Sequence, residues 1–134
     1  MIRDVIILGS GAAGLTAALY AARANLHPLL FSGSEPGGQL TITSDVENYP
    51  GFAEPIQGPK LMEEMRKQAE RVGTEIIDGP VTAVELKSRP FKVVSNEKTY
   101  DTKTLIVATG ASAMLLGLES ERKLMGKGVS ACAT

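Results

Sequence analysis

The six residues GSGAAG, at positions 9–14, constrain the fold of this chain more than any other stretch. They follow a wholly apolar run, Val5–Leu8, and open a stretch rich in Ala and Leu that extends to Ala24. A short run without polar residues is typical of a strand buried on both faces, and Ala and Leu favour a helix. The sequence therefore predicts a strand, a tight glycine turn and a helix, as in an α/β fold with a parallel sheet.

The three glycines of this G-x-G-x-x-G pattern have different expected roles. Gly9 permits the tight turn, Gly11 lets the backbone approach a pyrophosphate, and Gly14 lets the helix pack closely against the strand. The first helical N–H groups carry a partial positive charge that favours phosphates. The turn is completed by three small residues, Ser10, Ala12 and Ala13. The pattern thus predicts a dinucleotide site.

The second expected strand, Leu29–Phe31, ends at Ser32. Nicotinamide-binding folds usually carry an acidic residue here, which holds the ribose of the dinucleotide. Glu35 follows in the loop, where its carboxylate would either reach that ribose or remain solvated. The pattern leaves both interpretations open.

A long loop over residues 32–52 is rich in Gly and Pro, which disfavours regular structure across most of it. The pair Gly37-Gly38 lets a backbone approach a large ring closely, which favours a flavin dinucleotide over a simple nicotinamide cofactor. The amide of Asn48 can donate and accept hydrogen bonds, as the polar edge of a flavin requires. Asn48 would equally suit a turn cap before Pro50.

The remaining segments predict an amphipathic helix, a group of antiparallel strands and one more buried strand. The helix is expected over Pro59–Val72, and the buried strand, Leu105–Ala108, runs into a small-residue turn at a place where α/β sheets bind ligands. That turn comprises Thr109, Gly110 and Ala111. The short strands are expected at Glu75–Ile77, Val81–Leu86, Phe91–Val94 and Lys98–Asp101.

Charge and composition argue against several classes of function. A net charge of −1 gives no electrostatic footprint for nucleic acid. No apolar stretch is long enough to span a bilayer, and no signal-peptide pattern is present, so we expect no membrane partner. One cysteine cannot form an intrachain disulfide, which favours the reducing cytoplasm. The single histidine, His27, has no cysteine or acidic cluster at metal spacing, so we expect no metal site.

Several stretches, in this order and spacing, closely resemble the low-molecular-weight thioredoxin reductases. That family comprises NADPH-dependent flavoenzymes of the pyridine nucleotide-disulfide oxidoreductase group. The resemblance implies a Rossmann-like FAD-binding domain with a central parallel sheet, a small antiparallel β-meander and an incomplete second domain. The stretches are VIILGSGAAGLTAALYAARANL, GGQLTITSDVENYPGF, GPKLMEEMRKQAERVGTEII, RPFKV, IVATGASA and GKGVSACAT.

The family's FAD contacts transfer to this chain residue by residue. Ala12 replaces a proline of the family motif with little expected loss, because alanine forms helices well. Ser32 departs from the acidic residue of many relatives. The matching positions are Gly9, Ser10, Gly11, Ala12, Ala13 and Gly14 in the first motif, Gly33, Ser34, Glu35, Pro36, Gly37, Gly38, Gln39 and Leu40 in the loop, and Asn48, Val81, Thr109, Gly110 and Ala111.

The stretch GVSACAT matches the start of the family's redox motif. The resemblance implies that Cys132 exchanges with thioredoxin and that a second cysteine follows in a C-A-T-C pair. It also implies a FAD-binding portion at 1–112 and, at 113–134, a crossover into the NADPH and redox-cysteine domain. We expect a homodimer as the full-length protein, and no turnover by these 134 residues alone, because a lone thiol cannot resolve a mixed disulfide.

Three alternatives stay open. A ferredoxin- or flavodoxin-NADP reductase of the same type would share the fold but lack the cysteine pair, and SACAT argues against it. The printed residues alone would act as a non-catalytic FAD-binding module. A dehydrogenase that uses only a nicotinamide cofactor is a weaker alternative.

Overall fold

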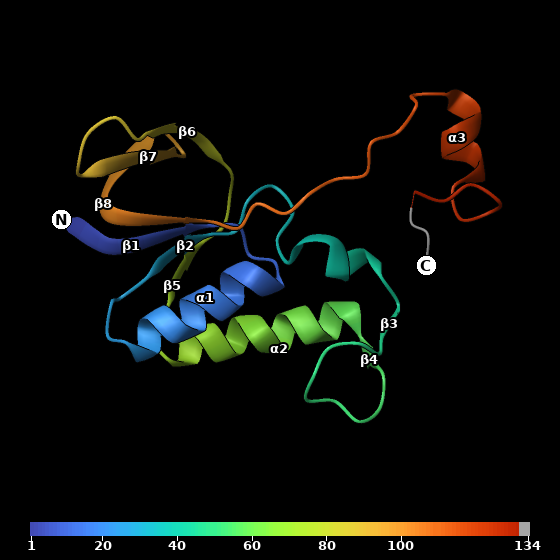
Figure 1. Cartoon of the computed structure of the whole chain (residues 1–134), viewed down its shortest axis with the longest axis horizontal. Coiled ribbons are helices and arrows are strands. Elements are labelled where there is room, and N and C mark those ends of the chain that lie inside the picture. Colours follow the sequence, from blue (N-terminus) through green and yellow to red (C-terminus); the bar gives the residue numbers. More distant parts are fainter. Residues whose placement is uncertain (132–134) are drawn as a thin grey trace.

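The computed structural model describes residues 1–131 and is built on a six-stranded sheet with the order β5-β2-β1-β8-β7-β6 (Figure 1). The first four strands in that order are parallel, and β7 and β6 continue as an antiparallel meander. The strands are β1 (Ile2–Leu8), β2 (Leu29–Phe31), β5 (Glu75–Ile77), β6 (Val81–Glu85), β7 (Phe91–Ser95) and β8 (Lys98–Val107). The predicted fold class is confirmed.

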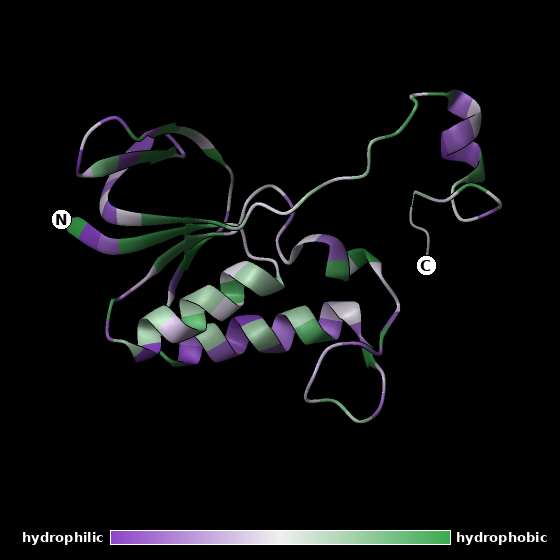
Figure 2. Cartoon of the chain, viewed as in Figure 1, coloured by the Kyte–Doolittle hydropathy of each residue, from purple (hydrophilic) through white to green (hydrophobic). Residues whose placement is uncertain are grey.

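Two helices, α1 (Ala12–Arg23) and α2 (Gly58–Arg71), cover one face of the parallel strands (Figure 1). Helix α2 is apolar on one face and charged on the other, and Figure 2 shows hydrophobic and hydrophilic residues following one another along it. It begins with a proline in its first turn. Its apolar face, which includes Leu61 and Met65, packs with Leu15 of α1 against Ile7 and Leu30 of the sheet.

The meander of β6, β7 and β8 contributes to a second core on the other face. Val93 of β7 clusters there with Ile6 and Phe31, and the Phe31 ring meets Tyr100 edge-on with the centroids 5.1 Å apart. The second half of β1, Val5–Leu8, and the whole of β2 are therefore enclosed on both faces, which is the physical reason for their uninterrupted apolar sequence.

Two predicted features differ in the structure. Strand β8 is continuous over Lys98–Val107, because it pairs first with β7 and then runs on beside β1. The loop at 32–52 contains a 3₁₀ helix, Gly38–Ile42, and the strand β3 (Asp45–Val46), which pairs with β4 (Ile56–Gln57). Such short elements rest on a few local hydrogen bonds and leave no periodic apolar pattern.

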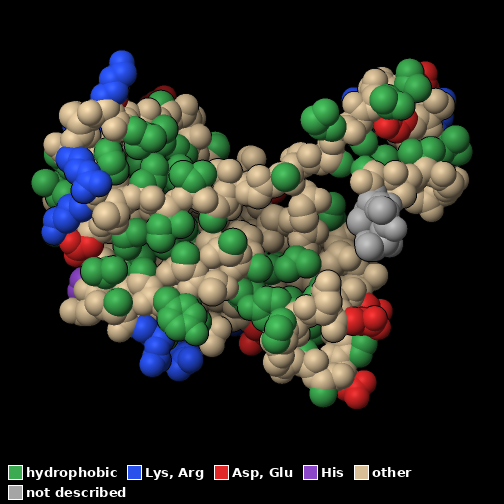
Figure 3. All heavy atoms as spheres, in the orientation of Figure 1, with side chains coloured by type: hydrophobic (Ala, Val, Ile, Leu, Met, Phe, Trp, Pro, Cys, Tyr) green, Lys and Arg blue, Asp and Glu red, His purple; other side chains and the backbone are tan. Residues whose placement is uncertain are grey.

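The chain after β8 leaves the sheet and ends in a small lobe with helix α3 (Glu119–Leu124) (Figure 1). The Glu121 carboxylate accepts hydrogen bonds from the amides of Leu116 and Gly117 at 3.1 and 3.0 Å. Apolar side chains lie exposed on this segment, and Figure 3 shows several on its surface. Cys132 lies outside the described residues. Among residues 1–131, no helix combines the length and the apolar character that crossing a membrane requires.

Candidate functional site

A cleft of about 720 Å³ opens at the carboxyl ends of β1, β2 and β8, beside β6. Its size falls within the range of small-molecule and cofactor sites. Its position is the one at which open α/β sheets bind ligands, outside the carboxyl ends of the parallel strands. Segments from four parts of the chain converge here, because the parallel strands all end at this edge.

Most of the predicted site residues line this cleft. They are Gly9, Ser10, Gly11, Ala12, Ala13, Gly33, Ser34, Glu35, Gly37, Gly38, Gln39, Leu40, Val81, Thr109, Gly110 and Ala111. Gly14 is buried behind the turn, and Pro36 lines a smaller adjoining groove. Asn48 is exposed in the loop and is not among the residues lining the cleft, and Cys132 lies outside the described residues.

The cleft has further lining residues that the motifs did not indicate. Most of them directly adjoin a predicted segment, so extending each motif along its strand would have found them. They are Leu8, Phe31, Ser32, Pro80, Thr82, Ala83, Val84, Ala108 and Ser112. Glu35 is the one charged side chain among the residues lining the cleft. An anionic ligand would therefore meet mainly backbone amides and small side chains.

The glycines of the first motif meet different surroundings. A Cβ added at Gly14 would lie 1.9 Å from the Gly9 carbonyl oxygen, and one at Gly9, where φ is +105°, would lie 2.2 Å from the Ala108 oxygen. A Cβ at Gly11 would meet nothing within 4 Å. Gly9 and Gly14 thus permit the close packing of turn, helix and strand, while Gly11 keeps the turn bare on its open side.

The N-terminus of α1 lies at the cleft, because Gly11, Ala12 and Ala13 are among its lining residues. Its N-cap residue is Gly11, no side chain caps it, and its first turn contains no acidic residue. The first N–H groups of a helix have no intrahelical acceptor and carry a partial positive charge. This bare, electropositive turn fits the pyrophosphate of a dinucleotide.

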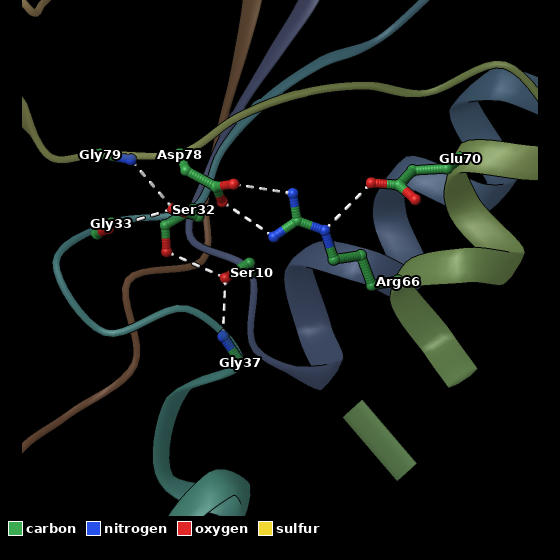
Figure 4. A network of polar contacts seen from close by, with 8 residues as sticks. All are labelled: Ser10, Ser32, Gly33, Gly37, Arg66, Glu70, Asp78 and Gly79. Carbon is green, nitrogen blue, oxygen red and sulfur yellow. Dashed lines mark hydrogen bonds and ion pairs between the residues drawn. The ribbon is translucent and has the colours of Figure 1, made fainter. Parts of the chain in front are cut away.

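Two buried serines join the segments around the cleft (Figure 4). The Ser10 hydroxyl donates to the Ser32 carbonyl at 3.0 Å and accepts from the Gly37 amide at 2.9 Å. The Ser32 hydroxyl donates to the Gly33 carbonyl at 3.1 Å and accepts from the Gly79 amide at the same distance. An ionised carboxylate at position 32 could not donate to Gly33, which explains why a serine suits this position.

An ion pair lies directly behind this serine cluster. Arg66 of α2 donates two parallel hydrogen bonds to Asp78, at 2.8 and 2.9 Å, and a third to Glu70 at 3.0 Å. The hydrogen bond from Arg66 lowers the pKa of Asp78 against the effect of partial burial, and the positive charge of Arg66 and the Ser32 hydroxyl add to the lowering. The hydrogen bond to Asp78 raises the pKa of Arg66 in turn. Neither residue was predicted, because no motif or spacing links positions 66 and 78.

Among the described residues, no group of three or more His, Cys, Asp or Glu side chains is arranged to hold a metal ion. Apart from Glu35, the cleft itself is lined mainly by glycine, polar uncharged side chains and apolar side chains. Its chemistry is therefore that of recognising a ligand through backbone amides, shape and apolar contact.

Comparisons with known proteins agree with this geometry. The family model described as pyridine nucleotide-disulphide oxidoreductase matches residues 3–134. A thioredoxin reductase of Rickettsia bellii is 60% identical over 131 residues, covering 97% of this chain and 42% of the relative. A glucosaminate ammonia-lyase of Pseudomonas fluorescens is 56% identical over 130 residues, covering 97% of this chain and 41% of the relative.

Solved structures include the thioredoxin reductase from Giardia duodenalis, which superposes with a TM-score of 0.86 at 43% identity. That match covers 99% of this chain and 44% of the other. The chain thus spans well under half of the length of these similar proteins.

Proposed function

Because the chain belongs to the pyridine nucleotide-disulphide oxidoreductase family, we propose that its cleft binds FAD. The observation that carries the proposal is the glycine turn at the N-terminus of α1, which is open at Gly11 and free of acidic side chains. The nearby Gly38 adds a second bare backbone segment, since a Cβ there would lie 3.7 Å from the Gly11 Cα. Two glycine segments this close together suit the narrow pyrophosphate of an extended dinucleotide.

The lining residues divide between the two halves of such a ligand. We propose that the amides at Gly11–Ala13 bind the pyrophosphate and that Glu35, the charged residue of the cleft, accepts hydrogen bonds from the adenosine ribose. Val81 would contact the adenine. The flavin half would lie along Gly37–Leu40, and Thr109–Ala111 would form a second turn on the nucleotide side. Asn48 would reach the flavin only if the exposed loop folds inward.

The reaction that this site serves is proposed from the relatives. The chain spans about 42% of the length of the Rickettsia thioredoxin reductase. We propose that the full-length protein reduces the disulfide of thioredoxin at the expense of NADPH, with the NADPH site in the remaining length. Bound FAD supplies two-electron transfer between nicotinamide and disulfide. Cys132 would be the thiol of a C-A-T-C pair that attacks the disulfide of thioredoxin. The full-length protein would act as a homodimer in the cytoplasm.

The Pseudomonas relative supports a second candidate. Its name describes release of ammonia from glucosaminate, and it is 56% identical to this chain over nearly the same residues. The two candidates share the dinucleotide cleft and differ in the reaction that they predict. If the full-length protein oxidises NADPH only when thioredoxin is present, the reductase candidate is supported. If it releases ammonia from glucosaminate without NADPH, the ammonia-lyase candidate is supported.

The cleft is tested by titrating FAD into the 134-residue chain and following flavin fluorescence. A Gly11→Val variant should weaken binding by about tenfold or more, because its side chain would enter the space needed by the pyrophosphate. The thermal unfolding midpoint should change little, since nothing lies within 4 Å of that Cβ position. Equal FAD affinity in the parent chain and in Gly11→Val would overturn the assignment of the turn at Gly11 to the pyrophosphate.

A further inference from the structure

We propose that the ion pair between Arg66 and Asp78 is a positioning device for the adenosine side of the cleft. The pair does not line the cleft itself. It holds the backbone around Gly79, and this backbone holds the Ser32–Gly33 wall that does line it. The inference rests on the proposed FAD site and names residues that no motif of the chain indicates.

Arg66 and Asp78 are joined by two parallel hydrogen bonds, whereas an ordinary surface salt bridge has a single contact. Both guanidinium N–H₂ groups of Arg66 meet one oxygen each of Asp78, at 2.8 and 2.9 Å, while its Nε donates to Glu70. Figure 4 shows Arg66 and Glu70 on α2, with the guanidinium directed at the segment that carries Asp78 and Gly79. A planar fork held at three points loses less side-chain freedom on pairing than a single flexible contact does.

The contact passes from Asp78 to the cleft through the next residue. The Gly79 amide donates to the Ser32 hydroxyl at 3.1 Å, and the Gly33 amide donates to the Gly79 carbonyl at 3.2 Å. The Ser32 carbonyl in turn accepts from Ser10, beside the phosphate turn. One side chain of α2 is thereby linked to two walls of the cleft.

The backbone at Gly33, in the cleft wall, and at Gly79, behind it, benefits from an external anchor because glycine is intrinsically free. Gly33 and Gly79 both lie in the left-handed region, with φ of +83° and +130°. Glycine has the largest conformational entropy to lose when it is ordered, and it has no side chain with which to pack. A fixed partner for the adjacent Asp78 reduces the range of positions that this segment can sample.

The expected effect is moderate, because the Asp78 side chain is 58% exposed and the Arg66 side chain 33% exposed. Solvent screens such a pair, so we expect a loss of affinity rather than a loss of fold. Arg66→Met should weaken FAD binding by about five- to tenfold, in line with the contribution of a charged hydrogen bond. Arg66→Lys keeps the charge but not the two parallel hydrogen bonds, so its FAD affinity should lie between those of the parent chain and Arg66→Met.

A matched control is the ion pair of Arg3 with Glu75, which joins β1 to β5 at 2.6 Å with side-chain exposures of 24% and 51%. It lies at the amino ends of the parallel strands, away from the cleft, so Arg3→Met removes a comparable pair without touching the adenosine wall. FAD affinity should be unchanged in this variant. ADP, which carries the adenosine and phosphate groups without the flavin, should follow the pattern of FAD across all the variants.

Amide hydrogen exchange in the ligand-free chain gives a readout that is independent of FAD. Exchange at Gly33 and Gly79 should accelerate in Arg66→Met and Asp78→Asn, and remain unchanged in Arg3→Met. If the variants bind FAD as the parent chain does and exchange at the parent rate, the positioning role is overturned while the FAD site stands. If the parent chain binds neither FAD nor ADP, the proposed function fails on this chain, and faster glycine exchange still decides whether the anchor exists. Should Arg66→Met fail to fold, the near-isosteric Asp78→Asn provides both measurements.

Discussion

The sheet with its two helices and the segment that follows β8 differ in what they bury. Ile7 and Leu30 in the sheet are fully buried, whereas Met114 and Leu116 after β8 are 98% and 82% exposed. Both regions contain the same kinds of apolar residue, but among the described residues those of the sheet and its helices pack into buried clusters, whereas those after β8 stay exposed. The cleft belongs mainly to the packed region, and the exposed segment begins at its rim, near Thr109–Ser112. The candidate site therefore rests on the two buried clusters that flank the sheet, to which the described part of the segment after β8 adds little.

The sharpest test of this view is a change at the tightest point of the packed region. Gly14→Val would place a Cβ only 1.9 Å from the Gly9 carbonyl oxygen, so α1 would have to move off the sheet. We expect the free energy of unfolding to fall by about 3 kcal/mol or more. Urea denaturation measures it, with Gly11→Val as the control that adds the same side chain in open space. Similar stability of the two variants would show that the glycine turn tolerates a looser helix.

A smaller effect should separate one residue type in the two regions. Leu30→Ala removes a fully buried side chain from the core, with an expected cost of about 2–5 kcal/mol. Leu116→Ala removes a side chain that is 82% exposed, with an expected change within about 0.5 kcal/mol. The same denaturation experiment measures both. A substantial cost at Leu116 would contradict the comparison, because it would mean that the terminal segment packs against the body in solution.

The same difference decides how much of the fold the sequence predicts. The apolar run at Val5–Leu8 and the amphipathic pattern at Pro59–Val72 arise from burial against the rest of the chain, and both predicted elements form, the helix over Gly58–Arg71. Helix α3 was not predicted, because its six residues have no buried face from which a periodic pattern could arise. The continuity of β8 depends on its change of partner from β7 to β1, which is a property of the sheet and not of the local residues.

The candidate site shows the same limit. The glycine turn was predictable because a bare backbone beside a helix N-terminus requires specific residues at fixed spacing. The role of Ser32 was not, because the sequence indicates only that an acid is absent there, while the structure shows both functions of its hydroxyl in use. The pairing of Arg66 with Asp78 depends on how α2 crosses the end of β5, and residues of these types occur at many exposed positions.

The smallest predicted effect concerns the lobe itself. Glu121→Ala removes the carboxylate that accepts from the amides of Leu116 and Gly117, so the turn before α3 should open locally. Because Leu116 and Gly117 are both exposed, we expect the global free energy of unfolding to change by less than about 0.5 kcal/mol. Amide exchange should accelerate at these two residues and remain unchanged at buried strand positions such as Ile7. Glu119→Ala, which removes an exposed i,i+4 pair with Lys123 on the same helix, is the control and should leave the two amides protected. Acceleration that extends into β1 would show that the lobe and the sheet unfold as one unit.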